Sequence, residues 1–137
     1  MINQLLNITK VAKDEQHIID AMAQHSRIDD EEMGLLIRMG KAILRKQSED
    51  IEELYTKIKI IHQNASETFE GIEAQIIQSD FNKQKQHDLL RIYLHTQRIS
   101  ETIILTARSM IIFSRLKRPF PVLMHPHLET MLDQTQE

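Results

Sequence analysis

Apolar residues recur every three or four positions along most of this chain, which is the spacing of an amphipathic helix. The most regular run crosses residues 51–76, and it predicts a helix that packs on its neighbours along a coiled-coil-like seam. Its members are Ile51, Leu54, Ile58, Ile61, Ala65, Phe69, Ile72 and Ile76. No stretch alternates with period two, and no dipeptide typical of a hairpin turn occurs. The pattern therefore predicts an all-α fold.

Three other segments show the helical spacing. The first helix is expected over residues 3–24, and the pattern then breaks over His25–Asp29. The second helix begins near Asp30 and ends before Ser48, because serine favours the N-cap of a following helix. No Gly or Pro forces this second break, so one continuous helix across it stays open as an alternative. The fourth helix is expected over residues 87–115.

About four long helices joined by short links predict an antiparallel bundle. All prolines lie at or after residue 119, so the helices before that point can run unbroken. We therefore divide the chain into a helical bundle over residues 1–118 and a proline-containing tail over residues 119–137, with room for a short helix. The fourth helix is apolar nearly all round between Ile103 and Phe113. This excess of apolar surface predicts a homodimer.

The amino-acid composition excludes several classes of function. The chain has 137 residues, enough for one domain with its own core. It has no cysteine, which excludes thiol catalysis, cysteine-ligated metals and disulfides. The formal net charge of −3 and the aromatic content of 4% argue against nucleic-acid binding. No apolar run reaches the roughly 20 residues of a membrane span, and no signal sequence is recognised, so a cytoplasmic location is expected.

The sequence holds no pattern typical of catalysis. The serines lie along helices without an elbow turn, and the isolated glycines form no phosphate-binding loop. The acidic clusters Asp29–Glu32 and Glu49–Glu53 lie at predicted helix starts, where carboxylates favour the positive end of the helix dipole. We interpret both as solvated caps, with divalent-cation binding as the alternative. The chain is accordingly expected not to be an enzyme.

Two histidines and one glutamate are candidate metal ligands. His62 lies beside the apolar stripe of the 51–76 helix, and His95 and Glu101 lie on the fourth helix. If these helices pack together, the three side chains would offer nitrogen and carboxylate ligands to a metal ion. The alternative, which the sequence favours, is that the histidines are partly buried and hydrogen-bonded.

Two further groups of polar residues have a structural role as one interpretation. Gln63, Asn64 and Ser66 are expected to form a polar layer in the bundle, of the kind that fixes helix register. A basic cluster ends the fourth helix, and it could contact an acidic partner or anionic lipid headgroups. Its alternative role is to complement the helix dipole. The candidate partner-contact residues here are Arg115, Lys117, Arg118 and Phe120.

Four stretches resemble the PhoU-like regulators of phosphate transport, especially the branch encoded with low-affinity phosphate permeases. They lie within roughly residues 15–117, and the likeness is one of pattern and helix order. The stretches are DDEEMGLLIRMGKAILRKQ, EDIEELYTKIKIIHQNASETFEGIEAQII, HDLLRIYLHTQRISETI and ILTARSMIIFSR. Members of this family can bind iron or zinc through acids. This chain is shorter than the family and lacks most of those acids. At the matching positions only Glu101 keeps a carboxylate, and His62 would substitute as a ligand for the divalent or iron ion that the resemblance implies.

The resemblance further implies a non-catalytic regulator. Such a protein would be a helical homodimer that contacts a membrane phosphate permease or its signalling partners, cytoplasmic and peripheral to the inner membrane. Exposed apolar helix faces and the loop at 119–126 would make the contact. Two alternatives stay open, namely a metal-binding helical bundle and a helical adaptor for an unrelated partner.

Overall fold

The computed structural model describes residues 2–116, and every element among them is a helix. The elements are α1 (Ile2–Leu44), α2 (Ser48–Phe69), α3 (Ile72–Gln78) and α4 (Lys83–Arg115). The predicted all-α class is therefore confirmed for these residues. The predicted tail over residues 119–137 lies outside them.

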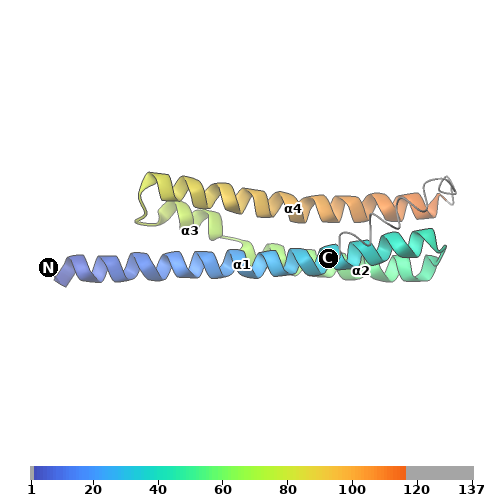
Figure 1. Ribbon diagram of the computed structural model, residues 1–137, viewed down its shortest axis with the longest axis horizontal. Coiled ribbons are helices and arrows are strands. Elements are labelled where there is room, and N and C mark those ends of the chain that lie inside the picture. The colour runs from blue at the N-terminus through green and yellow to red at the C-terminus, as the bar shows by residue number, and fades with distance from the viewer. Residues whose placement is uncertain (1, 117–137) are drawn as a thin grey trace.

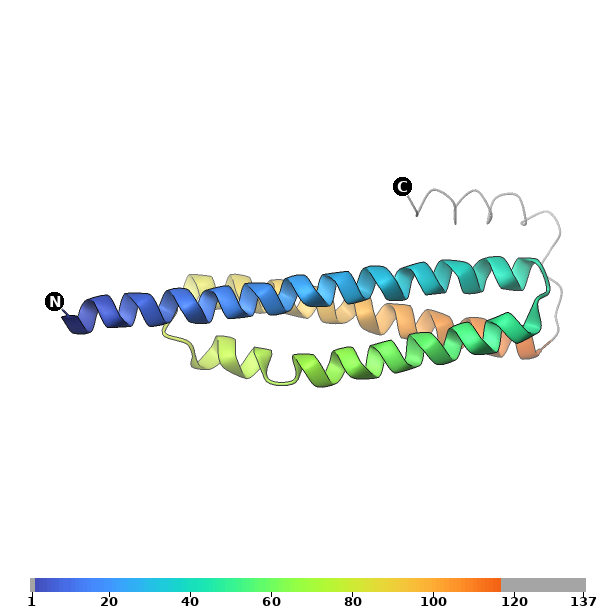
Figure 2. The same ribbon diagram turned by 90° about the horizontal axis from the view of Figure 1, so that it is seen from below.

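The helices form an elongated bundle of three rods (Figure 1). The chain runs along α1, reverses at residues 45–47, returns through α2 and α3, and reverses again at residues 79–82 before α4. The view from below shows α3 continuing the direction of α2 after a kink (Figure 2). Each of α1, α2 and α4 packs against the other two. The shared core therefore lies along the axis between the three rods.

The break predicted over His25–Asp29 is wrong, because α1 is one helix of 43 residues. Seven of its buried side chains follow one another at alternating spacings of four and three residues, which is the repeat of a coiled-coil seam. They are Ile18, Met22, His25, Asp29, Glu32, Leu36 and Met39. Three polar residues thus occupy core positions of an uninterrupted seam. The two helices expected over residues 3–46 are consequently a single rod.

The break after α1 is confirmed, but the predicted N-cap is wrong, because Gln47 is the N-cap of α2 and Ser48 is its first helical residue. Lys46 adopts φ 59°, and the amide of Gln47 donates to the carbonyl of Ala42 at 3.0 Å, which closes the last turn of α1. The seam predicted over residues 51–76 is buried largely as expected, but its helix is interrupted at Gly71, which has φ 96°. The fourth helix starts at Lys83 rather than residue 87, because Asn82 Oδ1 accepts from the amide of Lys85 at 2.9 Å.

Gly71 gives the first testable prediction. A β-carbon at Gly71 would meet nothing within 4 Å, so only its left-handed backbone disfavours another residue. Gly71→Ala should lower the free energy of unfolding by about 1–2 kcal/mol. The matched control is Gly34→Ala in α1, where the new methyl also has free space and alanine should stabilise the helix by up to about 1 kcal/mol. Urea unfolding of both variants checks this, and equal shifts in the two would contradict it.

Two apolar clusters fill the axis of the bundle. The first surrounds the α1–α2 turn and the C-terminal half of α4, and it contains Leu36, Met39, Ala42, Ile51, Leu54, Ile58, Ile103, Ile104, Ala107 and Ile111. The second lies at the α3 end, and it contains Ile18, Met22, Phe69, Ile72, Ile76, Phe81 and Leu89. Between the two clusters, the seams of α1, α2 and α4 carry polar side chains.

Candidate functional site

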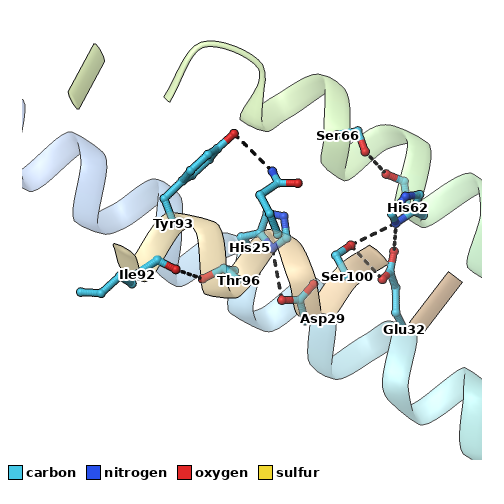
Figure 3. A network of polar contacts seen from close by, with 10 residues as sticks. His25, Asp29, Glu32, His62, Ser66, Ile92, Tyr93, Thr96 and Ser100 are labelled. Atoms are coloured by element: carbon cyan, nitrogen blue, oxygen red, sulfur yellow. Dashed lines mark hydrogen bonds and ion pairs between the residues drawn. The ribbon is translucent and has the colours of Figure 1, made fainter. Parts of the chain in front are cut away.

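Five polar residues from three helices meet between the apolar clusters, and we call them the polar layer. They are His25, Asp29 and Glu32 from α1, His62 from α2 and Ser100 from α4 (Figure 3). Glu32 is fully buried, and His25, Asp29 and Ser100 are between 2% and 6% exposed. Burial of this many polar groups is costly unless they contact one another. The layer is therefore the chemically distinctive part of the core.

A chain of contacts crosses the layer from α2 to α1 by way of α4. His62 Nδ1 lies 3.0 Å from Ser100 Oγ, and Ser100 Oγ donates to Glu32 Oε2 at 3.4 Å. The other carboxylate oxygen, Glu32 Oε1, lies 3.6 Å from His62 Nδ1. Each of the three rods thus contributes one member. The side chain of His62 is 24% exposed, so this chain of contacts begins at the surface and ends in the core.

His25 and Asp29 form the second half of the layer, one turn apart on α1. Their Nδ1 and Oδ2 atoms are 3.2 Å apart. The His25 ring also meets Phe69 edge to face, with centroids 4.1 Å apart, so it borders the second apolar cluster. Spacing of four residues on a helix places such a pair on one face. The pair therefore connects the polar layer to the apolar core beside it.

Three buried atoms of the layer have no hydrogen-bond partner. They are His25 Nδ1, Asp29 Oδ1 and Glu32 Oε1. His25 Nδ1 lies close to Asp29, and Glu32 Oε1 lies near His62. These two atoms are therefore near a group of opposite charge but form no hydrogen bond with it. An unsatisfied buried polar atom costs about 1–3 kcal/mol. The layer thus carries an energetic cost in the fold.

The two carboxyl groups of the layer hold protons more tightly than usual. Burial raises the pKa of Glu32 from 4.5 to about 7, the negative charge of Asp29 adds to this, and the Ser100 hydrogen bond opposes it. Burial also raises the pKa of Asp29, against the opposing influence of His25. Both effects favour the neutral acid, because a buried charge has lost its hydration. Glu32 therefore titrates near neutral pH.

The pKa of His62 is lowered, and for a base this also favours the neutral form. Burial lowers its pKa below 6.5, the nearby His25 lowers it further, and the charges of Asp29 and Glu101 partly compensate. A neutral His62 beside a carboxyl group that titrates near 7 can share a proton with it. The arrangement can accordingly bind or release a proton inside the bundle, and it can fix the register of the three helices.

The candidate metal ligands are divided between different surroundings. His62 belongs to the polar layer, whereas His95 is exposed and lines a groove between α1 and α4. Glu101 is exposed on α4, near enough to His62 to influence its charge. Across residues 2–116, no group of three or more His, Asp or Glu side chains could hold a metal ion. The structure thus brings His62 to Glu32 and Ser100, and it does not group it with His95.

The interpretation of Asp29–Glu32 as a solvated cap is wrong for its two ends, because Asp29 is 6% exposed and Glu32 is fully buried inside α1. The polar layer predicted at Gln63, Asn64 and Ser66 is also wrong, since these side chains are exposed. A polar layer exists, but neighbouring His62 supplies the α2 member. The signal that identifies the true members is the four–three spacing that continues from Ile18 to Met39.

The basic end of α4 is engaged within the chain. Arg115 Nε and Nη2 donate to Glu52 Oε1 and Oε2 at 3.0 and 3.1 Å, and this bidentate pair joins the end of α4 to the first turns of α2. The other predicted partner-contact residues, Lys117, Arg118 and Phe120, lie outside the described residues. Arg115 therefore has a structural contact of its own.

Comparison with known proteins gives no assignment for this chain. No family model, curated protein or solved structure matches it. Among residues 2–116, no helix is long and apolar enough to cross a membrane.

Proposed function

We propose that this chain is a non-catalytic regulator of inorganic phosphate transport that acts by protein–protein contact with a phosphate permease or its signalling partners. The observation that carries the contact is a set of large apolar side chains that α4 exposes instead of burying. They are Ile92, Leu94, Ile99, Leu105 and Ile112, together with Leu116 at its C-cap, each 50–61% exposed. So many half-exposed aliphatic side chains along one segment are unusual for a surface that faces only water.

One of these residues, Ile99, lines a groove of about 380 Å³ between α1 and α4. Met33, Leu36, Ile99 and Ile103 give it an apolar lining, and polar residues of α4 border it. A shallow apolar groove between two helices fits the apolar side of a partner helix. We propose that a segment of the permease or of its signalling partner occupies this groove.

The assignment to phosphate transport comes from the resemblance of the four sequence stretches to PhoU-like regulators. In the same proposal the protein is a homodimer of antiparallel bundles at the cytoplasmic face of the membrane, held there by its partner. A helical adaptor for an unrelated partner would use the same groove. The groove therefore does not distinguish the adaptor from the regulator, whereas a measurement of phosphate uptake does.

The proposal predicts a change in phosphate uptake when the gene is deleted, measured in cells over a range of external phosphate concentrations. Wild-type protein should restore uptake. Ile99→Glu should fail to restore it, because the new charge lies in the groove. Ile60→Glu is the control, since Ile60 is 54% exposed on α2, away from the groove. Circular dichroism of both purified variants checks that each remains helical.

Uptake that stays unchanged by the deletion at every phosphate concentration would overturn the regulator proposal. A change in uptake that both variants restore equally would retain the regulator and remove the groove as its contact surface.

A further inference from the structure

The outer side of α4 carries a strip of residues that points away from the core. Its apolar members are Leu94, Leu105, Ile112 and Leu116, spaced by eleven, seven and four residues, and such spacings keep side chains on one helix face. Each residue turns an α-helix by about 100°, so buried Ala107 lies about 200° from Leu105. These apolar members are therefore opposite the seam that packs into the bundle, and none of them lines the α1–α4 groove.

Charged residues lie between the apolar ones on the same strip. Arg98, Glu101 and Arg108 fill the remaining positions of a four–three repeat that runs from Leu94 to Ile112. All three are exposed, and neither Glu101 nor Arg108 forms an ion pair with another residue of the described chain. The strip thus combines half-exposed aliphatic side chains with charges that have no partner within 4.0 Å.

We propose that this strip binds the same strip of a second copy of the chain, with the two α4 helices antiparallel and a two-fold axis at Leu105. The inference specifies the surface of the homodimer and rests on the proposed function for that dimer. Isologous contacts of this kind require a surface that is complementary to itself. The strip meets that requirement on both apolar and charged positions.

The three leucines of the strip are symmetric about Leu105. Leu94 lies eleven residues before it and Leu116 eleven after it, so each would face the other across the axis. Leu105 would meet its own copy. Arg98 and Ile112 lie seven residues to either side, and the aliphatic stem of an arginine can cover an isoleucine while its charge stays in water.

The charges decide the direction of the pair. Glu101 lies four residues before Leu105 and Arg108 three after it, so antiparallel helices bring opposite charges together twice. A parallel pair would place Glu101 on Glu101, Arg98 on Arg98 and Arg108 on Arg108. Like charges facing each other across an interface are strongly unfavourable. Antiparallel pairing is therefore the arrangement in which the whole strip is complementary.

The first test is the mass of the full-length chain in solution over a wide range of concentration, by analytical ultracentrifugation. Two strips of one helix each bury a small interface, so the dimer should dissociate on dilution. The mass should rise with concentration from the 16.1 kDa of one chain towards twice that value. Leu105→Glu should remain monomeric throughout, because two carboxylates would meet at the axis, whereas Ile60→Glu on α2 should dimerise normally. A wild-type chain that stays monomeric, or a dimer that Leu105→Glu leaves intact, would overturn the proposal.

The second test is a charge exchange that reports the direction. Glu101→Arg and Arg108→Glu should each weaken the dimer, because like charges then meet, and the double variant should restore it. A parallel pair predicts no such restoration, since identical residues would still face each other in every variant. Absence of rescue in the double variant would therefore exclude the antiparallel pairing. Sedimentation and phosphate uptake are independent measurements, so failure of the dimer and failure of the proposed function are distinguishable.

Discussion

Replacing Phe69 by alanine is expected to lower the free energy of unfolding by about 3–5 kcal/mol, which is the usual cost of truncating a fully buried aromatic ring. Phe69 is 1% exposed and belongs to the second apolar cluster. Its ring also contacts the His25 ring edge to face at 4.1 Å. The substitution would therefore leave a cavity beside a buried imidazole whose Nδ1 already lacks a hydrogen-bond partner.

Urea unfolding followed by circular dichroism measures this effect. Ile77→Ala is the matched control, because Ile77 is 57% exposed on the adjacent α3 and its truncation should change stability by no more than about 0.5 kcal/mol. The stability loss in Phe69→Leu should lie between the two, since leucine retains part of the apolar side-chain volume. Equal losses in Phe69→Ala and Ile77→Ala would show that the second cluster is not a packed core.

The helical seams are the part of the fold that sequence predicts well. The run from Ile51 to Ile76 is buried at most of its predicted positions. Its apolar side chains lie on one face of the helix, and that face packs against the other two rods. Hydrophobic periodicity reports which face of a helix is buried, and it does so with little help from tertiary context. The all-α class follows from the same information.

The polar layer is the part that a hydrophobic pattern conceals. His25, Asp29 and Glu32 interrupt the apolar sequence, so they indicate a loop or a helix start when polarity alone is considered. The structure places them in the middle of α1 because their spacing continues the seam, and because His62 and Ser100 on other helices provide contacts. Such contacts join residues up to 68 positions apart, and no local pattern predicts them.

Helix boundaries fall between these two cases. The turn after α1 is present where the sequence predicts it, although Gln47 and not Ser48 is the N-cap of α2. The kink at Gly71 is absent from the prediction, because an isolated glycine is compatible with a continuing helix and only its φ of 96° shows the interruption. The surroundings of the candidate metal ligands are less predictable still. His62 and His95 are the same residue type, but His62 lies beside Glu32 in the polar layer and His95 lines the α1–α4 groove.

Replacing Glu32 by glutamine is expected to stabilise the protein at pH 8 and to leave it nearly unchanged at pH 5. Glu32 is fully buried and its pKa is raised to about 7. At pH 5 the folded chain holds the carboxyl group neutral, and glutamine resembles that form in shape and charge. At pH 8 the wild-type carboxylate is ionised in the core, where a charge is costly, and glutamine removes that cost.

The sign and size follow from proton linkage. The pKa of Glu32 is about 7 in the folded chain, and 4.5 is its ordinary value. Between these values the folded state binds a proton that the unfolded state has released, so the stability from this group is fully present below about pH 4.5, is lost as pH rises to about 7, and changes little above that. One pKa unit corresponds to about 1.36 kcal/mol, so the loss is on the order of 3 kcal/mol by pH 8.

His62 and Asp29 titrate as well, but both are present in the wild type and in the variant. The lowered pKa of His62 makes the fold lose stability as pH falls below 6.5, which opposes the contribution of Glu32. The informative quantity is consequently the difference in unfolding free energy between Glu32→Gln and wild type, measured in urea at steps from pH 5 to pH 8. It should become more favourable to the variant as pH rises.

Glu31→Gln provides the control, because it is the same substitution at the neighbouring, exposed position of α1. Its effect should stay within about 0.5 kcal/mol of wild type across the range. If Glu32→Gln instead became less stable than wild type as pH rose, the ionised carboxylate would be stabilised by its contacts with Ser100 and His62. The polar layer would then be an ion-paired network, and a neutral acid at Glu32 would be excluded. A difference that follows the expected sign identifies Glu32 as the group through which the bundle responds to pH near neutrality.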